Sequence, residues 1–184
     1  AAVLPLAHEF VLGNELVRVA MPVLQELAKT SQETASISVR VGFTRVAIQR
    51  VEGVHPLRFA LPIGQRLPLH VGAGKVLAAA MPAAEREQWL DELEEAFLAK
   101  GETLSRKALK TDLEKIRRQG FAVSVGDRLE GTFAITAPVV DALKETIAAV
   151  NVAGAVERLT PKRIETLSIE VRDAAKTIGE RYNV

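Results

Sequence analysis

Residues 72–75 (GAGK) are the first place where residue types and spacing suggest chemistry, because glycine loops that end in lysine cradle phosphates. Such a loop also needs a glycine five positions before the Gly-Lys pair and a hydroxyl residue after it, but Leu69 and Val76 stand there. A dinucleotide-binding loop fails too, since its third glycine would be Leu77. Two interpretations remain: backbone N–H groups at a helix start that hold a ligand carboxylate or carbonyl, or a tight turn before a packed helix.

Other catalytic and metal-binding patterns are missing from the sequence. His8, His55 and His70 are far apart, and none lies three or four residues from another. There is no Gly-x-Ser-x-Gly elbow, no obvious Ser/His/acid grouping and no cysteine. We therefore expect no catalytic residues, no metal site and no cofactor.

Three successive segments, at 121–125, 132–137 and 147–153, alternate in a way that is typical of strands with two different faces. One face is bulky and apolar, with residues such as Phe133, Ile135, Val150 and Val152. The other face carries only small or weakly polar side chains: Ala122, Ser124, Thr132, Ala134, Thr136, Ala149, Asn151 and Ala153.

A sheet face that is open to water normally carries long charged side chains, and the three small faces have none. Something must therefore cover them. A helix, a loop or a second subunit lying close on the sheet is one explanation. The other is a concave pocket in which a few hydroxyl and amide groups orient a small ligand.

The elements that would position these residues can be read from hydrophobic periodicity. We expect helices at 14–29, 83–98 and 105–119, a short helix after residue 74, and a last helix that opens at Thr160-Pro161. Strands are expected as a hairpin around Gly42, at 57–63, and at 121–125, 132–138 and 146–153. Pro22 should kink the first helix or start a new segment. Short connections between the strands indicate a mainly antiparallel sheet with helices packed on it.

Length and charge are those of one globular domain, or of a domain with a short extension. The chain has 184 residues, 26% of them charged, and a formal net charge of +1. That balance argues against a polyanion-binding surface and against a disordered acidic chain. The lack of cysteine fits a reducing cytoplasm. No apolar run reaches the roughly 20 residues of a membrane span, and we expect no export signal.

Several blocks of the sequence resemble the effector-binding domain of transcriptional regulators of the isocitrate-lyase-regulator (IclR) family. They are GQRLPLHVGAGKVLAAAMP at 64–82, GFAVSVGDRLEGTFAITAPVVD at 120–141, AAVNVAG at 148–154, and Arg158-Leu159-Thr160. LVRVAMPVLQELAKTSQETASISV at 16–39 resembles the segment that joins the two domains of such regulators, with the first strand of the sensor. Three departures stand out: Asp127 replaces the usual Glu, Val140 replaces a common aromatic residue, and the interval from His70 to Lys75 is one residue shorter.

The resemblance implies an α/β fold in which helices flank a curved, mainly antiparallel sheet of about six strands, similar to the GAF/profilin-like fold. A metabolite would bind on its concave face. Carried over position by position, the pocket consists of Phe59, Leu61, Gly72, Ala73, Ser124, Thr132, Ala134, Asn151 and Ala153. Five of these residues, Ser124, Thr132, Ala134, Asn151 and Ala153, also belong to the small strand faces described above. Two separate arguments therefore predict the same positions.

The resemblance also implies a domain plan and partners. Residues 1–30 would form a linker helix region and 31–184 the effector-binding domain, while the N-terminal winged helix-turn-helix is absent from this chain. Expected partners are a small-molecule effector, other copies in a homo-dimer or tetramer, and DNA only through the missing domain, with no membrane. The effector is expected to be a small metabolite, with an organic acid as the candidate and Arg58 or Arg128 as charge partner. The alternative is a stand-alone sensor or an oligomerisation module without ligand-controlled DNA binding.

Overall fold

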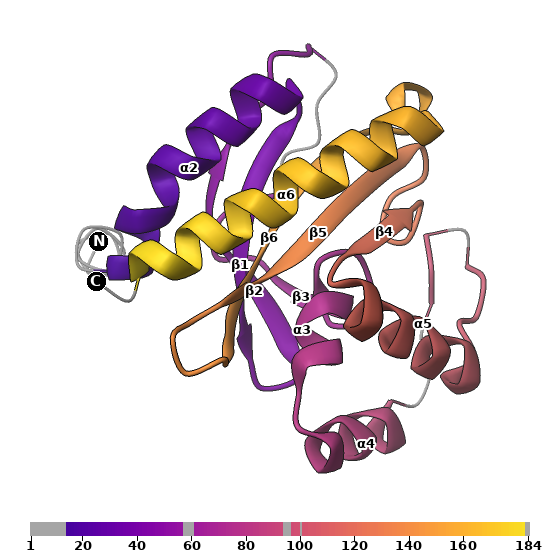
Figure 1. Cartoon of the computed structure of the whole chain (residues 1–184). Coiled ribbons are helices and arrows are strands. Elements are labelled where there is room, and N and C mark those ends of the chain that lie inside the picture. Colours follow the sequence, from indigo (N-terminus) through magenta and orange to yellow (C-terminus); the bar gives the residue numbers. More distant parts are fainter. Residues whose placement is uncertain (1–13, 57–60, 94–96, 100, 183–184) are drawn as a thin grey trace, which may run out of the picture.

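The computed structural model describes residues 14–56, 61–93, 97–99 and 101–182. The elements are α2 (Glu15–Ser31), β1 (Thr34–Val41), β2 (Thr44–Val51), β3 (Arg66–Pro68), α3 (Gly74–Ala80), α4 (Ala83–Glu92), α5 (Arg106–Gln119), β4 (Ala122–Val125), β5 (Thr132–Val140), β6 (Thr146–Ala155), the 3₁₀ turn η1 (Val156–Arg158) and α6 (Pro161–Tyr182). Figure 1 shows how the helices surround the sheet. Within these ranges no helix is both long and apolar enough to cross a membrane.

The six strands form one sheet in the order β3-β2-β1-β6-β5-β4, and every neighbouring pair is antiparallel. Two hairpins, β1–β2 and β5–β6, meet in the middle, where β1 pairs with β6. The expected fold class, an antiparallel sheet of about six strands flanked by helices, is confirmed. Because β1 and β6 are far apart in sequence, the centre of the sheet joins the two ends of the chain.

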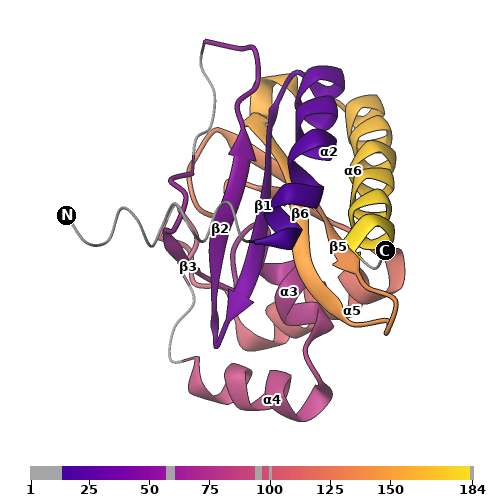
Figure 2. The same ribbon diagram turned by 90° about the vertical axis from the view of Figure 1, so that its left-hand side faces the viewer.

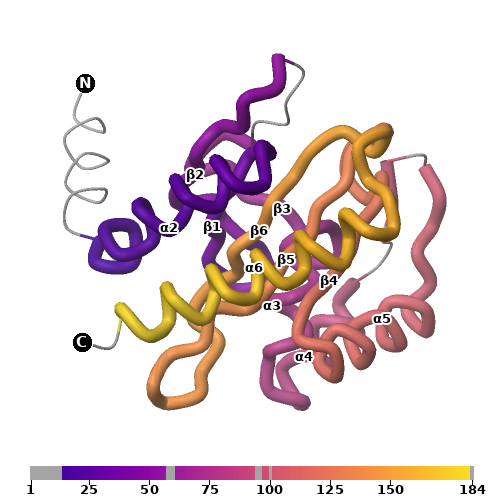
Figure 3. The backbone as a smooth tube through the Cα atoms, turned by 45° about the horizontal axis from the view of Figure 1, so that its top comes forward, coloured from indigo at the N-terminus to yellow at the C-terminus, as the bar shows by residue number. Residues whose placement is uncertain are grey.

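The bulky strand faces turn toward α2 and α6, which lie side by side against the sheet (Figures 2 and 3). The side chains of this main core include Leu24, Leu27, Phe133, Ile135, Val150, Val152, Leu167 and Val171, all of them buried. Helix α2 therefore packs into the same core as the sheet. The division of the chain at residue 30 stays a prediction.

The small strand faces turn the other way, toward α3 and α5. Ala122 of β4 and Ala149 of β6 pack in a second core with Val76 of α3 and Leu113 of α5, and Trp89 of α4 joins it. Alanine at these strand positions allows the helices to approach the sheet closely. A helix cover is therefore the correct explanation for this part of the small face, and the remaining part borders a cavity.

Three helix starts carry the capping residues that the sequence indicates. The side chain of Asn14 accepts from the Val17 N–H at 3.1 Å, and that of Ser105 from the Ala108 N–H at 3.2 Å. Thr160 caps α6 in the same way. Gly120 ends α5 in the left-handed conformation at φ 76°. These local signals account for the starts of α2, α5 and α6 and for the end of α5.

The strand expected at 57–63 is wrong in its described part. Residues 57–60 lie outside the described ranges, and residues 61–63 are not in a strand. The edge strand β3 forms at Arg66–Pro68 instead. The reason is local: Pro62 has no N–H to give to a ladder, and the chain turns at Gly64, whose N–H bonds to the Ala47 carbonyl at 2.8 Å.

Two expectations about helices also need correction. The helix expected at 83–98 ends at Glu92, and Phe97 pairs with Thr103 in an isolated bridge. Acidic residues follow Asp91 in the sequence, and negative charges are repelled by the negative C-terminal end of a helix dipole. This repulsion disfavours a longer helix. Of the two expectations for Pro22, a new segment is wrong, since α2 runs unbroken through it, while a kink stays a prediction. Pro22 lies on the exposed side of the helix, where water can satisfy the carbonyl that its ring leaves without a donor.

One buried ion pair joins the end of α2 to the start of α6. Glu33 is 1% exposed, and its carboxylate accepts two hydrogen bonds from Arg158, at 2.7 Å from Nε and 2.6 Å from a terminal nitrogen. A Cβ at Gly154 would collide with this carboxylate. Gly154 therefore leaves the space for the Glu33 side chain, and Arg158 supplies its counter-charge.

Removing one partner of this pair leaves a buried charge without compensation. We expect Arg158→Met to lower the free energy of unfolding by about 3 kcal/mol, measured by urea denaturation. The matched control is Arg18→Met, whose exposed pair with Glu15 should be worth about 0.5 kcal/mol or less. Equal losses in the two variants would contradict the structural role of the pair.

Candidate functional site

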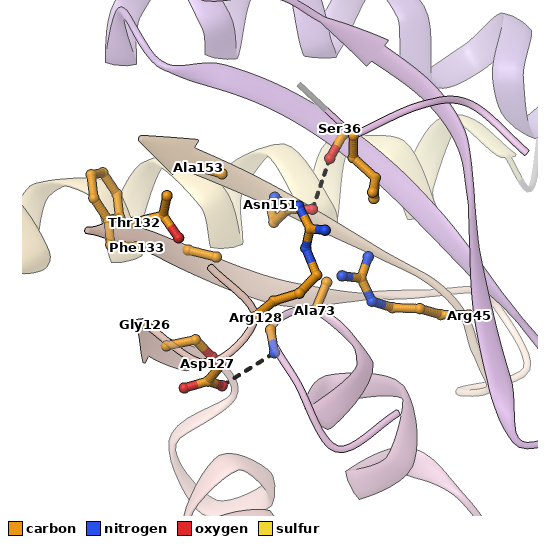
Figure 4. A pocket seen from close by; sticks show the side chains of 14 residues that line it. Ser36, Arg45, Ala73, Gly126, Asp127, Arg128, Thr132, Phe133, Asn151 and Ala153 are labelled. Carbon is orange, nitrogen blue, oxygen red and sulfur yellow. Dashed lines mark hydrogen bonds between the residues drawn. The ribbon is translucent and has the colours of Figure 1, made fainter. Parts of the chain in front are cut away.

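A cavity lies between the small strand faces, the loop that enters α3 and the β4–β5 turn (Figure 4). Its wall consists of Ser36, Arg45, Leu61, Gly72, Ala73, Ser124, Gly126, Asp127, Arg128, Thr132, Phe133, Ala134, Asn151 and Ala153. Eight of the nine expected pocket residues are in this wall. The ninth, Phe59, lies outside the described residues. That these residues bind a ligand stays a prediction at this point.

Strand register explains why residues far apart in sequence meet at the cavity. Ser124 on β4 stands opposite Ala134 on β5, which stands opposite Ala153 on β6. In the next row, Asn151 on β6 stands opposite Ser36 on β1. Directly opposite residues point to the same side of an antiparallel sheet. The alternation in each strand and the register between strands together produce one small-sided floor.

The polar groups of the floor differ in how well they are satisfied. The Ser36 hydroxyl donates to the Asn151 side-chain oxygen at 2.9 Å, and the Thr132 hydroxyl donates to the Leu129 carbonyl at 2.6 Å. The Ser124 hydroxyl is buried, with the residue only 4% exposed, and has no hydrogen-bond partner. Buried polar atoms without partners are rare because they lose their bonds to water. Ser124 is therefore available to a ligand.

The loop before α3 is held by an ionic cluster rather than by a ligand. The Lys75 ammonium lies 2.9 Å from a carboxylate oxygen of Asp112 on α5 and 2.9 Å from one of Asp127 in the β4–β5 turn. The same Asp127 carboxylate accepts the Gly72 N–H at 3.2 Å. Burial by itself would lower the pKa of Lys75, but the two carboxylates outweigh it and raise this pKa.

This cluster bears on the two interpretations of residues 72–75. The Gly72 N–H donates to a carboxylate of the protein itself, and the Lys75 ammonium is paired with carboxylates. Gly72 has φ +54°, a conformation that glycine adopts at little cost. A Cβ at Gly74 would lie 2.6 Å from the Leu69 Cα, so the helix start packs against the chain before the loop. The residues form a tight turn before a packed helix, and a role of this loop in holding a ligand stays a prediction.

Sequence reasoning missed three polar residues of the cavity wall: Ser36, Arg45 and Asp127, the last noted only as a departure from the family. Ser36 and Arg45 lie in the first hairpin, to which the argument from small strand faces was not applied. Ser36 and Ser38 alternate with the apolar Ile37 and Val39, and Arg45 alternates with Val46, so the signal was present in the sequence. Arg128, proposed as a charge partner, lies in the wall, and Arg58 is outside the described residues.

The cavity is small and positively charged. It leaves about 40 Å³ for the centres of water-sized molecules, which is room for roughly three waters. The side chains of Arg45 and Arg128 both extend into it, with the Arg128 guanidinium beside Asn151 (Figure 4). Burial, and next the charge of Arg128, lower the pKa of Arg45 to about 10, so Arg45 keeps its proton at neutral pH. Across the described ranges, no group of three metal-ligating side chains is found.

Comparison with known proteins agrees with this geometry. The family model of the bacterial transcriptional regulator IclR C-terminal region matches residues 8–180. The chain belongs to the IclR C-terminal family. It is 31% identical over 173 residues to the transcriptional repressor AllR of Escherichia coli K12, and 27% identical over 165 residues to the transcriptional regulator KipR of Bacillus subtilis.

The IclR protein of Thermotoga maritima, a solved structure, superposes on this domain with a TM-score of 0.88 at 25% identity. The alignment covers 100% of this chain and 74% of that chain. The AllR and KipR alignments cover 92% and 89% of this chain, but only 63% and 66% of those proteins. The chain thus spans just under two thirds of the length of these curated relatives.

The ionic cluster of this IclR domain gives a first test of the site. We expect Lys75→Met to lower the unfolding free energy by about 3 kcal/mol and to speed amide exchange at Gly72, because Asp127 loses its counter-charge. Urea denaturation and hydrogen exchange measure the two effects. Lys110→Met, which removes an exposed pair with Glu87, is the control and should cost less than about 1 kcal/mol. Unchanged exchange at Gly72 would show that the cluster does not hold the loop.

His70 predicts a pH dependence. Burial lowers its pKa, against smaller opposing effects of a backbone hydrogen bond at Phe97 and of the Asp127 charge. The unfolded chain therefore takes up the proton first as the pH falls through about 6.5. The free energy of unfolding of the wild type should fall between pH 7 and 5 more steeply than that of His70→Asn. Parallel curves from denaturation at each pH would rule out this contribution.

Proposed function

We propose that this domain is the ligand-sensing part of a bacterial transcriptional regulator and that a small metabolite binds in the cavity. One observation carries the proposal: eight of the nine residues that the family resemblance assigns to the pocket surround one cavity. Five of the eight were also reached from strand alternation alone. An unpartnered serine hydroxyl and two inward-pointing arginines on the cavity wall fit a polar ligand better than a packing defect.

The binding mode follows from the wall. Ser124 and Asn151 would hydrogen-bond the polar atoms of the effector, with Thr132 beside them and Leu61 against its apolar part. Phe59 would complete that apolar wall. A metabolite would need more room than the present space gives, so binding would shift the Gly72 loop or a side chain of the wall such as Arg128. An organic acid is the candidate effector because the wall carries two cations.

The signal would pass through the elements that share the main core. The ligand would favour one of two arrangements of the sensor or of its subunits. The shift in the equilibrium between the two arrangements equals the difference in the ligand's binding free energy for them. Helix α2 is packed against α6 and, apart from its last residue, belongs to residues 1–30, which we propose as the linker region to a winged-helix domain. DNA would be bound only through that domain, in the cytoplasm, by a homo-dimer or tetramer. AllR and KipR are named as helix-turn-helix regulators, which supports this plan.

The function is proposed to be regulatory rather than enzymatic. The relatives carry the names of regulators and repressors. The polar groups of the cavity are two arginines, hydroxyls and amide groups, together with an aspartate that Lys75 already engages. This set suits recognition of a ligand and contains no nucleophile paired with a base.

Thermal unfolding against a panel of small carboxylates, aromatic acids and sugar acids tests the proposal. A ligand present at 100 times its dissociation constant should add about 2.7 kcal/mol to stability, which is a rise of roughly 5–10 °C for a domain of this size. Asn151→Leu should abolish the rise and leave the fold intact, because the new side chain fills the floor of the cavity.

Asn14→Leu is the matched control, since it removes a helix cap far from the cavity. It should lower the free energy of unfolding by about 1 kcal/mol and keep the full response to the ligand. Asn151→Leu with a normal ligand response would remove Asn151 from the site. A flat response of the wild type to the whole panel would favour the alternative, an oligomerisation module whose small strand faces serve packing.

A further inference from the structure

Arg45 places a buried hydrogen-bond donor without a partner in the wall of the cavity. The residue lies on β2, is 5% exposed, and donates from Nη1 to the Ser38 hydroxyl at a long 3.3 Å. Its Nε is buried and has no hydrogen-bond partner. Burial removes the water that would otherwise bond this N–H group, and buried donors of this kind are rare. The Arg45 Nε is therefore a donor that remains for a ligand.

Arg158 shows, in this same fold, how an arginine edge binds a carboxylate. Its Nε and Nη2 donate to the two carboxylate oxygens of Glu33, at 2.7 and 2.6 Å. Two parallel bonds of this kind are the arrangement that the planar guanidinium group favours with a carboxylate. In Arg45 the bond to Ser38 uses Nη1, on the other side of the group. The Nε–Nη2 edge of Arg45 thus corresponds to the edge by which Arg158 holds a carboxylate.

This edge of Arg45 lies beside the loop that enters α3. A Cβ at Gly72 would come 3.6 Å from the Arg45 Nη2 atom, which is the distance of an ordinary contact. Gly72 and Arg45 both belong to the cavity wall. A shift of the Gly72 loop, which the size of the cavity requires for a metabolite, would therefore also open space next to the Nε–Nη2 edge.

The acid of the cavity wall does not serve as the counter-charge of Arg45. The Asp127 carboxylate is engaged by the Lys75 ammonium at 2.9 Å and by the Gly72 N–H at 3.2 Å. Both effects on the pKa of Arg45, burial first and the charge of Arg128 second, lower it, so no described carboxylate offsets them. A ligand carboxylate would supply the counter-charge to Arg45 alone, because Arg128 has an interaction of its own.

We propose that Arg45 is a specificity-determining residue that selects an effector with a carboxylate and holds this group through Nε and Nη2. The inference rests on the proposed function of the cavity. Ser124 and Asn151 would then bond the remaining polar atoms of the effector. A neutral compound of the same shape would leave a buried guanidinium without a negative partner, so it binds more weakly than the acid.

The binding test compares acids with their neutral amides. Propionate, benzoate and gluconate are paired with propionamide, benzamide and gluconamide, and affinity is measured by calorimetry and by the rise in unfolding temperature. The wild type should bind at least one of the acids, and at least about tenfold more tightly than the matched amide. Each pair shares its carbon skeleton, so the preference reports charge rather than shape.

Variants of Arg45 test whether this residue causes the preference. Arg45→Met should weaken binding of the acid by about 100-fold and remove the preference over the amide. Arg45→Lys keeps the charge but lacks the Nε–Nη2 fork, so it should weaken acid binding by about tenfold. It also decides the question if the methionine variant is too unstable to measure. Arg40→Met is the matched control: Arg40 stands across from Arg45 on β1, but its two hydrogen bonds go to Glu85. It should keep the affinity for the acid.

The outcomes separate this inference from the proposed function. If acids and amides bind the wild type equally, and Asn151→Leu binds neither, the cavity is a sensor but the role of Arg45 is wrong. Loss of the preference in Arg128→Met together with its retention in Arg45→Met would also overturn the inference. Binding of inorganic phosphate in place of every carboxylate would contradict the chemical class. If no compound binds, both proposals fall.

Discussion

The ion pair between Lys75 and Asp127 is the interaction on which the candidate site depends. Asp127 belongs to the turn between β4 and β5, while Lys75 and Gly72 belong to the entry of α3, so this contact ties two opposite walls of the cavity together. Asp112 extends the tie to α5. Two charges at 2.9 Å in a partly buried site attract strongly, and Gly72 can adopt the required positive φ without strain. The cavity is bounded by this cluster rather than by loops that are free to collapse.

The small strand faces serve two purposes on one sheet. Where Ala122 and Ala149 lie, α3 and α5 pack down on them and form a second core. A short distance along the sheet, Ala134 and Ala153 border the cavity. The same property, little side-chain volume, allows close packing in one place and leaves open space in the other. The ion pairs of Lys75 and the close packing at Gly74 fix the position of α3. This position determines where the close helix packing ends and the cavity begins.

The cavity also keeps polar groups that the fold would be more stable without. The Ser124 hydroxyl and the Arg45 Nε are buried without partners, and Arg45 faces a second arginine. The buried carboxylate of Glu33, by contrast, is matched closely by Arg158. Two of the four buried side-chain atoms without a partner among the described residues lie in this cavity, and the other two, on His70 and Glu170, lie outside its wall. Unpartnered polar groups in a cavity are typical of a binding site, in which stability is given up for recognition. This contrast connects the energetics of the fold to its proposed role as a sensor.

The sequence by itself determined the elements that rest on local rules. The helix caps at Asn14, Ser105 and Thr160 depend on neighbours within a few residues, and so does the alternation that separates Phe133 and Ile135 from Ala134. The failures came where local rules compete: at Pro62, and at the early end of α4. Only the tertiary structure decided that Lys75 bonds Asp127, and that Arg45 and Arg128 line the same cavity. These relations join residues 52 and 83 positions apart. They follow from strand register and from the packing of α3 across the sheet, which the order of residues along the chain does not specify.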